Sequence, residues 1–281
     1  MSQDLAESTH PSHSARSQLK LQQRPARAIR FGHIHADAVT AADAIDRIVD
    51  RVRSGEGGYV VTPNVDHVCL AEHDAELRAA YRDAFLSIPD GKPLLWIASW
   101  LGTPLPEKVS GSDLILPLLR RAADEGLTVF FLGSTEATCA AAARNLAAQC
   151  PGLRIGGWAS PVFDPAGDPT DVEEALEKVS AAHPDLLLVA MGCPKQEYLL
   201  WRYLEAYAPA VGVGVGGSLE FAAGSVRRAP RWVSDHGLEW LFRLAQEPGR
   251  LWRRYLVRDR HIVRIAWRMR REANRERVES V

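Results

Sequence analysis

One apolar run that breaks abruptly into polar residues constrains the fold more than any other feature of the chain. Leu186-Leu187-Leu188-Val189-Ala190-Met191 follows Pro184-Asp185 and is followed at once by the polar heptad Gly192-Cys193-Pro194-Lys195-Gln196-Glu197-Tyr198. A continuous apolar run between turn residues is typical of a strand buried on both faces of a parallel sheet, and Pro194 suits the start of a helix. Ligands bind at the carboxyl ends of such strands. The heptad is therefore either a ligand-binding loop or an ordinary turn with solvated polar side chains.

Five further apolar runs predict strands, and helical patterns lie between most of them. The predicted strands cover residues 59–61, 84–88, 128–132, 154–158, 185–191 and 210–215. Helices are predicted at 41–52, 93–101 and 113–125, and from a cap at Gly133-Ser134 to residue 148. Strands that alternate with helices form parallel sheets covered on both faces. The sequence thus predicts an α/β fold with a Rossmann-like parallel sheet of about six strands.

The chain divides by composition into three parts. Residues 1–30 are rich in Ser, Gln, His and Arg without an apolar core, which predicts a disordered tail and not a signal peptide. Residues 31–225 hold the predicted sheet. Residues 226–281 hold fifteen arginines against seven acidic residues, or +8, in a chain whose net charge is −1. No run of about eighteen apolar residues predicts a membrane span, and the four cysteines lack metal or redox spacing. We expect a cytoplasmic protein with reduced cysteines.

The C-terminal segment 226–281 combines its arginines with apolar residues at helical spacing, including Trp232, Trp240, Trp252 and Trp267. Such arginines can bind nucleic acid, lie on an anionic membrane or clamp a diphosphate, and a solvated helix face is the plain alternative. The tryptophans favour the membrane surface, because indoles prefer the headgroup layer. The rest of the chain is acidic and has no known nucleic-acid-reading fold, which disfavours nucleic acid. The segment predicts peripheral attachment to the inner face of the cell membrane, and its apolar face equally suits a homo-oligomer.

Polar residues at the ends of two other predicted strands are candidates for chemistry. Asp90 lies in the turn Pro89-Asp90-Gly91, where a shielded carboxylate can act as a general base, although turn aspartates more often bond their own backbone. Thr62 and Asn64 can hydrogen-bond a sugar or a base, or simply form a turn around Pro63. His67 follows them without a cluster of metal-ligand spacing, so no metal site is predicted.

The segment Gly212-Val213-Gly214-Val215-Gly216-Gly217 formally fits the dinucleotide fingerprint, so an NAD(P)-dependent oxidoreductase is an alternative function. The segment comes at the last predicted strand, however, and the fingerprint belongs to the first. We interpret 211–215 as a strand and Gly216-Gly217-Ser218 as a loop whose backbone N–H groups can meet a phosphate or a sugar. No P-loop and no nucleophile elbow is present.

Taken together and in order, several segments resemble the WecG/TagA/CpsF glycosyltransferases over about residues 30–257. The matching pieces are Thr62-Pro63-Asn64 with His67, Pro89-Asp90-Gly91, Lys108-Val109 with Gly111 and Asp113, Phe131-Leu132-Gly133, Gly192 with Pro194-Lys195-Gln196-Glu197, Val213-Gly214-Val215-Gly216-Gly217, Ala229-Pro230-Arg231-Trp232, Gly237-Leu238-Glu239-Trp240, Arg243-Leu244, Glu247-Pro248 and Arg250-Leu251. The ordered set is far more specific than any single motif.

The resemblance implies transfer of a sugar from a UDP-sugar to a polyprenyl-diphosphate-linked saccharide in cell-envelope or exopolysaccharide assembly. It implies that Asp90 is the base, that Thr62, Asn64 and Gln196 share its pocket, and that Lys108 stabilises the diphosphate. The other expected substrate contacts are Gly133, Gly192, Lys195, Gly216, Gly217, Glu220, Arg227 and Arg231. The alternative for Lys195 is a surface ion pair with Glu197.

Two departures from the family pattern bear on the substrate. Gly91-Lys92-Pro93 stands where many relatives have Gly-x-Gly, which is closer to exopolysaccharide-type members, and Lys108 stands where an arginine is common. Lysine keeps the charge but loses the bidentate fork. The donor sugar is therefore open between N-acetylmannosamine, glucose and a uronic acid. The sequence has no Asp-x-Asp motif, so we expect inverting, metal-independent catalysis without a cofactor.

Overall fold

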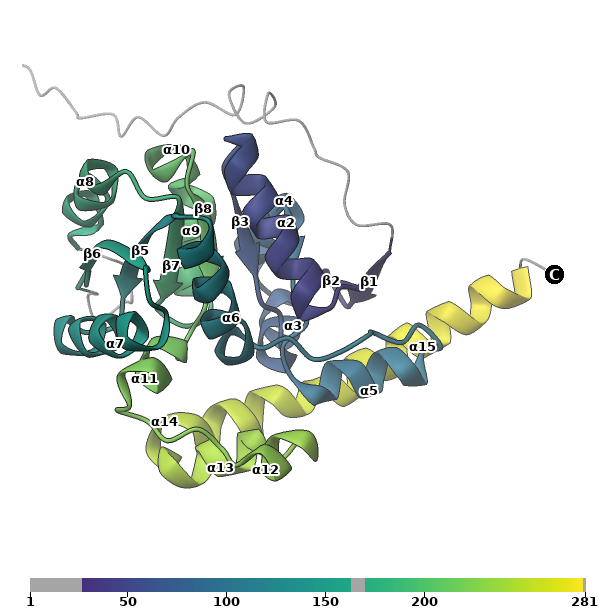
Figure 1. The fold of residues 1–281 in the computed structure, drawn as a ribbon. Coiled ribbons are helices and arrows are strands. Elements are labelled where there is room, and N and C mark those ends of the chain that lie inside the picture. Colours follow the sequence, from purple (N-terminus) through teal and green to yellow (C-terminus); the bar gives the residue numbers. More distant parts are fainter. Residues whose placement is uncertain (1–26, 163–169, 280–281) are drawn as a thin grey trace, which may run out of the picture.

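The structure is a computed structural model that describes residues 27–162 and 170–279 (Figure 1). The predicted disordered tail lies outside these residues up to position 26. Its predicted end at residue 30 is wrong, because β1 (Ala28–Phe31) pairs antiparallel with β2 (Ile34–Asp37) in a separate two-stranded hairpin. Ile29, Phe31 and Ile34 are buried, so the hairpin belongs to the folded core.

Six parallel strands form the central sheet in the order β4-β3-β8-β7-β5-β6. They are β3 (Gly58–Val61), β4 (Leu86–Ser87), β5 (Thr128–Gly133), β6 (Arg154–Ala159), β7 (Leu186–Ala190) and β8 (Val211–Gly214). Each lies within or close to a predicted strand, which confirms the Rossmann-like α/β fold. The strand order reverses between β3 and β5, and β8 and β7 lie between them. Such a reversal marks the sheet edge where ligands bind in open α/β folds.

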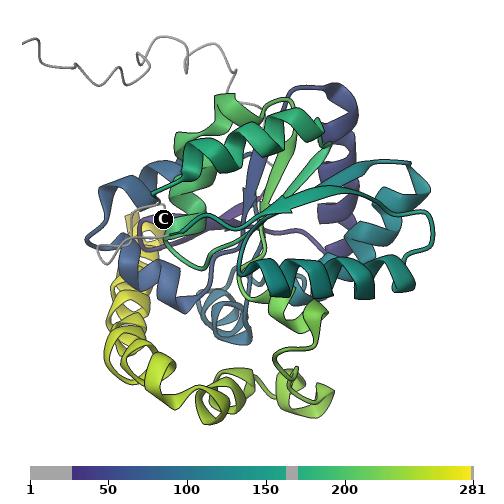
Figure 2. The same cartoon turned by 90° about the vertical axis from the view of Figure 1, so that its left-hand side faces the viewer.

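Successive side chains of strands such as β5 and β7 enter two different hydrophobic cores. The cores lie on the two faces of the sheet, and helices cover both faces in Figures 1 and 2. In β7, Leu187 and Val189 belong to one core, and Leu186 and Leu188 belong to the other. The first face is covered by α3 (Val65–Ala71), α4 (Ala75–Asp83), α8 (Val172–Ala182), α9 (Lys195–Arg202) and α10 (Leu204–Tyr207). The second is covered by α2 (Ala41–Ser54), α6 (Gly111–Asp124), α7 (Glu136–Gln149) and α11 (Ser218–Ala223). Burial on both faces explains why these strands are apolar throughout.

The C-terminal segment is helical and lies beyond the carboxyl ends of the strands, as Figure 1 shows. It comprises α12 (Arg231–Asp235), α13 (Glu239–Gln246), α14 (Pro248–Trp252), the π-helical η1 (Arg253–Arg258), η2 (Asp259–His261) and α15 (Ile262–Glu279). Within the described residues, no helix has both the length and the apolar character needed to cross a membrane.

The last helix, α15, is packed on the core. Its residues Ile265 and Met269 are buried, and the Met269 sulfur accepts from the Gly32 backbone at 3.3 Å. Trp267 meets Trp100 of α5 (Lys92–Trp100) edge to face, and Arg268 pairs with Glu72 at 2.6 Å. Arg268 therefore ties α15 to the end of α3.

The structure differs from the expectations in five local features. The hairpin, α4 and α8 were not predicted, and the alanine-rich helix α7 is capped by Thr135 and not by Gly133-Ser134. The Thr135 hydroxyl accepts from the Thr138 backbone at 3.2 Å, as N-cap residues do. Pro194 was predicted to start the next helix and is instead the N-cap residue of α9, which begins one position later at Lys195.

Candidate active site

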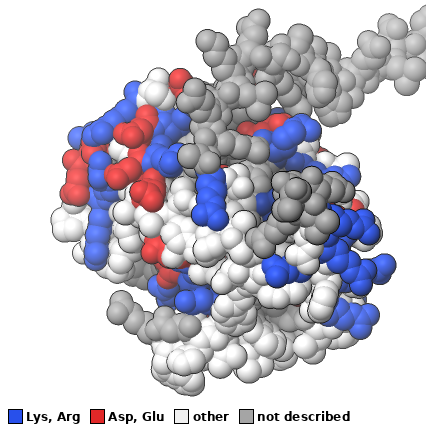
Figure 3. Space-filling model, turned by 90° about the vertical axis from the view of Figure 1, so that its right-hand side faces the viewer, with Lys and Arg blue, Asp and Glu red and all other residues white. Residues whose placement is uncertain are grey.

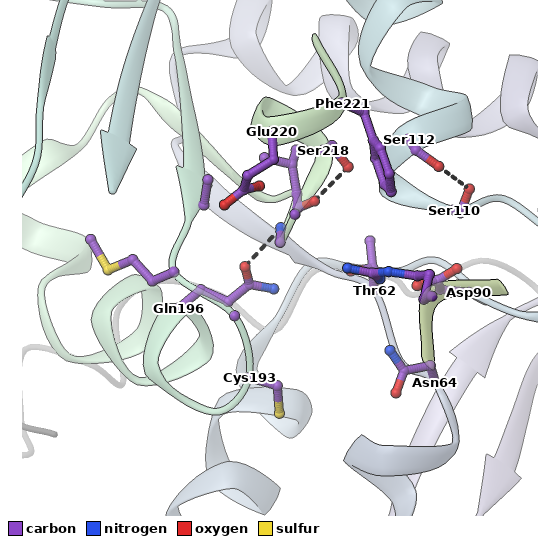
Figure 4. Close-up of a pocket in the computed structure, with 18 of the residues that line it drawn as sticks. Thr62, Asn64, Asp90, Ser110, Ser112, Cys193, Gln196, Ser218, Glu220 and Phe221 are labelled. Atoms are coloured by element: carbon purple, nitrogen blue, oxygen red, sulfur yellow. Dashed lines mark hydrogen bonds between the residues drawn. The ribbon is translucent and has the colours of Figure 1, made fainter. Parts of the chain in front are cut away.

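A polar cavity of about 440 Å³ opens at the carboxyl ends of β3, β5, β7 and β8. We call it the first cavity. It contains eight of the predicted site residues, which come from four separate segments, and Figure 4 shows several of them around the cavity. These are Thr62, Asn64, Asp90, Gly192, Gln196, Gly216, Gly217 and Glu220. The topology thus gathers residues that are up to 158 positions apart, from Thr62 to Glu220, at one edge of the sheet.

Asp90 follows β4 and is held by backbone hydrogen bonds on both sides of its turn. The Asp90 N–H donates to the Pro63 carbonyl at 2.8 Å, and the Val109 N–H donates to the Pro89 carbonyl at 2.9 Å. Burial raises the pKa of Asp90 from 3.8 to about 6, and the nearby charge of Glu239 adds to the rise, whereas Lys108 opposes it. A fixed carboxylate with a pKa near the working pH is the property that a general base needs.

Thr62 and Asn64 are held in place by neighbouring groups. The Thr62 hydroxyl donates to the Gly214 carbonyl at 3.2 Å, which ties the end of β3 to the end of β8. Asn64 caps α3, where its side-chain oxygen accepts from the Asp66 backbone at 3.0 Å and from Arg254 at 3.2 Å. Asn64 also bonds the Asp90 carboxylate, which lowers the pKa of Asp90.

Gln196 connects the heptad to the glycine loop. Its side-chain oxygen accepts from the Gly216 N–H at 2.9 Å, and its side-chain nitrogen donates to Glu197 at 2.8 Å. Gln196 is 2% exposed and Glu197 is fully buried. A surface ion pair between Lys195 and Glu197 is therefore wrong, and Glu197 instead fixes the orientation of the Gln196 amide.

The glycines of β8 make this burial possible. A Cβ on Gly212 would lie 2.3 Å from Leu200, and one on Gly214 would lie 2.9 Å from the Gln196 amide nitrogen. Their role is to let α9 approach the sheet closely. The fingerprint-like pattern of residues 212–217 is thus a strand with a packing function, followed by the loop and by the six-residue helix α11.

Glu220 lines the first cavity and provides a buried hydrogen-bond acceptor there. One of its oxygens accepts from the Ser134 hydroxyl at 3.3 Å, and the other is buried with no hydrogen-bond partner among the described residues. A buried carboxylate oxygen without a partner costs free energy, so it suits a ligand that brings a donor.

A second cavity of about 350 Å³ lies against the first, between the core and the C-terminal helices. Its wall includes Gly91, Lys108, Trp240 and Tyr255. Five residues line both cavities: Asn64, Asp90, Glu239, Arg243 and Arg254. Because Asp90 is one of the shared residues, it lies on the wall between the cavity at the strand ends and the cavity closed by the C-terminal segment.

The Lys108 ammonium lies 2.8 Å from Asp113 and 3.6 Å from Glu239, so its charge is partly neutralised.

The remaining predicted site residues lie elsewhere. Gly133, Lys195 and Arg227 line neither cavity. At Gly133 a Cβ would meet the Ala190 carbonyl at 2.6 Å, so this glycine serves close packing between β5 and β7. The Arg231 side chain lies outside the described structure.

Three charged residues that line both cavities were not selected from the sequence. Glu239, Arg243 and Arg254 reach it from the C-terminal segment, and the first two fall in the segments Gly237–Trp240 and Arg243–Leu244 that carry the resemblance. Those segments were the signal that could have identified them.

Comparison with known proteins places this geometry in context. Residues 29–276 match the model of the glycosyl transferase WecG/TagA/CpsF family. A relative from Bacillus spizizenii, named N-acetylglucosaminyldiphosphoundecaprenol N-acetyl-beta-D-mannosaminyltransferase, is 31% identical over 75% of this chain and 79% of its own length. A protein of the same name from Bacillus subtilis is 26% identical over 71% of this chain and 75% of its own length.

Proposed function

The chain belongs to the WecG/TagA/CpsF family of glycosyltransferases, and from this membership we propose that it moves a sugar from a UDP-sugar to a saccharide carried on a polyprenyl diphosphate. The names of the two Bacillus relatives describe a diphosphoundecaprenol-linked acceptor. Family membership as a glycosyltransferase leaves no support for the oxidoreductase and nucleic-acid alternatives.

One observation carries the proposal: Asp90 lies on the wall shared by the two cavities. A transferase must hold donor and acceptor on opposite sides of the reacting bond, with a base beside the acceptor hydroxyl. The first cavity suits the donor, because it is polar and has the orphan oxygen of Glu220 and the backbone of Gly216 and Gly217. The second cavity suits the acceptor, because the C-terminal segment that closes it also carries the exposed apolar residues that fit a lipid surface.

In this proposal the acceptor hydroxyl gives its proton to the Asp90 carboxylate while its oxygen bonds to the anomeric carbon. The bond from that carbon to the diphosphate breaks at the same time, and UDP leaves with the electron pair. Attack from the side opposite UDP inverts the configuration. Arg243 and Arg254, which line both cavities, supply positive charge for the departing diphosphate.

The donor and acceptor are tested directly by ligand binding and transfer. UDP-N-acetylmannosamine, UDP-glucose and a UDP-uronic acid are screened for thermal stabilisation, and the best donor is incubated with a short-chain lipid diphosphate carrying N-acetylglucosamine. We expect one donor to raise the Tm and to be transferred, with the same rate in excess EDTA. Stabilisation by NAD(P) and by none of the UDP-sugars would contradict the proposal.

We further propose that the C-terminal segment docks on an anionic membrane. Its exposed apolar side chains include Trp232 (65% exposed) and Leu241 (48% exposed). Trp96 of α5, which belongs to the core, lies against Gly237 of this segment. In Figure 3 basic side chains lie on both the left and the right of the face, and its lower part carries few charges. Apolar area ringed by arginines is the composition that binds anionic lipid surfaces.

A paired substitution tests this docking. Trp232→Ser with Leu241→Ser should weaken co-sedimentation with phosphatidylglycerol vesicles by roughly tenfold or more, since burial of each side chain is worth about 1.5–3 kcal/mol. Val162→Ser is the control, because Val162 is also exposed (61%) but lies outside the C-terminal segment. Equal vesicle binding by the double variant would refute the docking. If these side chains instead join two copies of the chain, the double variant will change the elution volume of the lipid-free protein.

A further inference from the structure

A cluster of metal-ligand side chains lies in the wall of the first cavity, although no sequence spacing indicates it. His67 comes from α3, Cys193 from the loop after β7, and Glu197 from α9. One potential ligand atom of each lies within 4.8 Å of the other two. His67 and Glu197 are buried, Cys193 is half-buried, and both His67 and Cys193 line the cavity. The fold thus joins positions separated by 126 residues, from His67 to Cys193, in one small volume.

The carboxylate of this cluster has an unused oxygen. Glu197 Oε1 accepts from the Gln196 amide at 2.8 Å, and the Cys193 thiol also bonds the carboxylate, whereas Oε2 is buried without an N–H or O–H donor among the described residues. Leaving a buried carboxylate oxygen unpaired is costly, and such an atom points to a missing ligand. The residue is fully buried, so bulk water does not satisfy this oxygen.

The histidine of the cluster is oriented by a neighbouring side chain. His67 Nδ1 lies 2.5 Å from the Tyr81 hydroxyl, and the two rings meet edge to face. Tyr81 is itself fully buried, so this contact fixes the imidazole plane. Because Tyr81 occupies Nδ1, Nε2 is the ring nitrogen left for a metal; in metal sites the nitrogen that does not bind the ion makes an orienting hydrogen bond of this kind.

From this arrangement we propose that His67, Cys193 and Glu197 bind one zinc-type divalent ion, with a further coordination position open to the first cavity. A nitrogen, a sulfur and a carboxylate oxygen are the ligands that Zn²⁺ prefers, and three protein ligands with an open position form a recognised zinc geometry. Magnesium is disfavoured, because it prefers oxygen ligands. This site is separate from the diphosphate-binding role proposed above and does not depend on it.

The charges around the cluster permit a cation. Arg254 and Arg258 repel it, but Asp66 lies within ion-pair distance of both, at 3.0 Å and 2.5 Å, and is itself 2% exposed. Binding replaces the S–H bond of Cys193 with an S–Zn bond and releases the proton to solvent. No oxidant or further reactant is needed.

Cobalt titration of the full-length, EDTA-treated protein tests the site, because Co²⁺ occupies zinc sites and its thiolate complexes absorb in the near ultraviolet. We expect the charge-transfer band to saturate at one equivalent of Co²⁺ and to vanish on addition of Zn²⁺. Cys193→Ser should lose the band, whereas Cys139→Ser should keep it, since Cys139 is buried against the Gly133 carbonyl at 3.1 Å and lies outside the cluster.

A second variant guards against a folding defect in Cys193→Ser. Glu197→Gln retains an oxygen that can accept from Gln196 but removes the charge, and we expect it to weaken Co²⁺ binding at least roughly tenfold with the Tm nearly unchanged. Absence of the band in the wild-type protein, or an undiminished band in Cys193→Ser, would overturn the proposal.

Discussion

Replacing Asp90 with Asn should remove most transfer activity and, at neutral pH, stabilise the fold. Asn has the same shape and its oxygen can still accept from Asn64, so the turn is preserved. Loss of a general base costs about 10²-fold or more in rate. The stability effect follows from the buried charge, because the pKa of Asp90 rises from 3.8 to about 6 on folding.

The size and the pH range of this effect follow from proton linkage. The folded chain holds the Asp90 proton more tightly than the unfolded chain does, so stability falls as pH rises between 3.8 and about 6. Over the complete ionisation of Asp90 the free energy of unfolding falls by about 3 kcal/mol, and between pH 5 and pH 8 it falls by about 1.4 kcal/mol. The Asn variant does not lose this stability, because its amide does not ionise. Its stability relative to the wild type should therefore grow by about 1.4 kcal/mol from pH 5 to pH 8.

Urea unfolding of both proteins at pH 5 and pH 8 measures the difference. Asp43→Asn serves as the control, because the Thr40 cap lowers the pKa of Asp43 from 3.8, so Asp43 is ionised in both states from pH 5 to pH 8 and its removal should change stability equally at the two pH values. A relative stability of the Asp90 variant that does not depend on pH would refute the burial argument. Near-normal transfer at saturating substrate would refute the assignment of the base.

Three further outcomes are expected. Glu239→Gln should move the acidic limb of the kcat/KM profile to lower pH, because the Glu239 charge helps to raise the pKa of Asp90, and an unmoved limb would show that the two groups do not interact. Gln196→Ala should raise the KM for the donor more than it lowers kcat, and it should lower the free energy of unfolding in urea by about 1–3 kcal/mol. The reason is that the Gly216 N–H and the Glu197 carboxylate lose their hydrogen-bond partner. A variant with unchanged KM and stability would contradict this. Gly133→Ala should lower the free energy of unfolding by roughly 2 kcal/mol more than Gly152→Ala, since both positions have positive φ but only Gly133 is crowded, and equal losses would argue against the close packing.

The central sheet could be predicted from the sequence because its strands are buried on both faces. Burial leaves uninterrupted apolar runs such as 186–190, and turn residues mark their ends. The hairpin β1-β2 escaped prediction because its strands are four residues long and carry polar residues such as Arg30 and His35. Helix α4 did leave a signal, since Leu77, Ala80 and Tyr81 have helical spacing and Asp74 provides a cap.

The candidate site was predictable only in part, for a geometric reason. Residues that directly follow strands, such as Thr62, Asp90 and Gln196, share one edge of a parallel sheet, so their proximity follows from the fold class. Residues that arrive from the C-terminal segment do so by tertiary packing, and no local pattern places Arg254 beside Asn64. The burial of Glu197 likewise depends on the space that Gly212 and Gly214 leave for α9.

The position of Glu239 implies that the basicity of Asp90 is not a property of the sheet alone. Glu239 sits 149 positions downstream of Asp90, in the segment that closes the second cavity, and its charge helps to set the proton affinity of that carboxylate. Displacement of the segment would remove Glu239, the smaller opposing effect of Arg243 and the cover from water together, so the proton affinity of Asp90 would fall. In the proposed mechanism the donor would then lie beside a weak base, and transfer of the activated sugar to water would be slow until the closing segment and the acceptor are both in place.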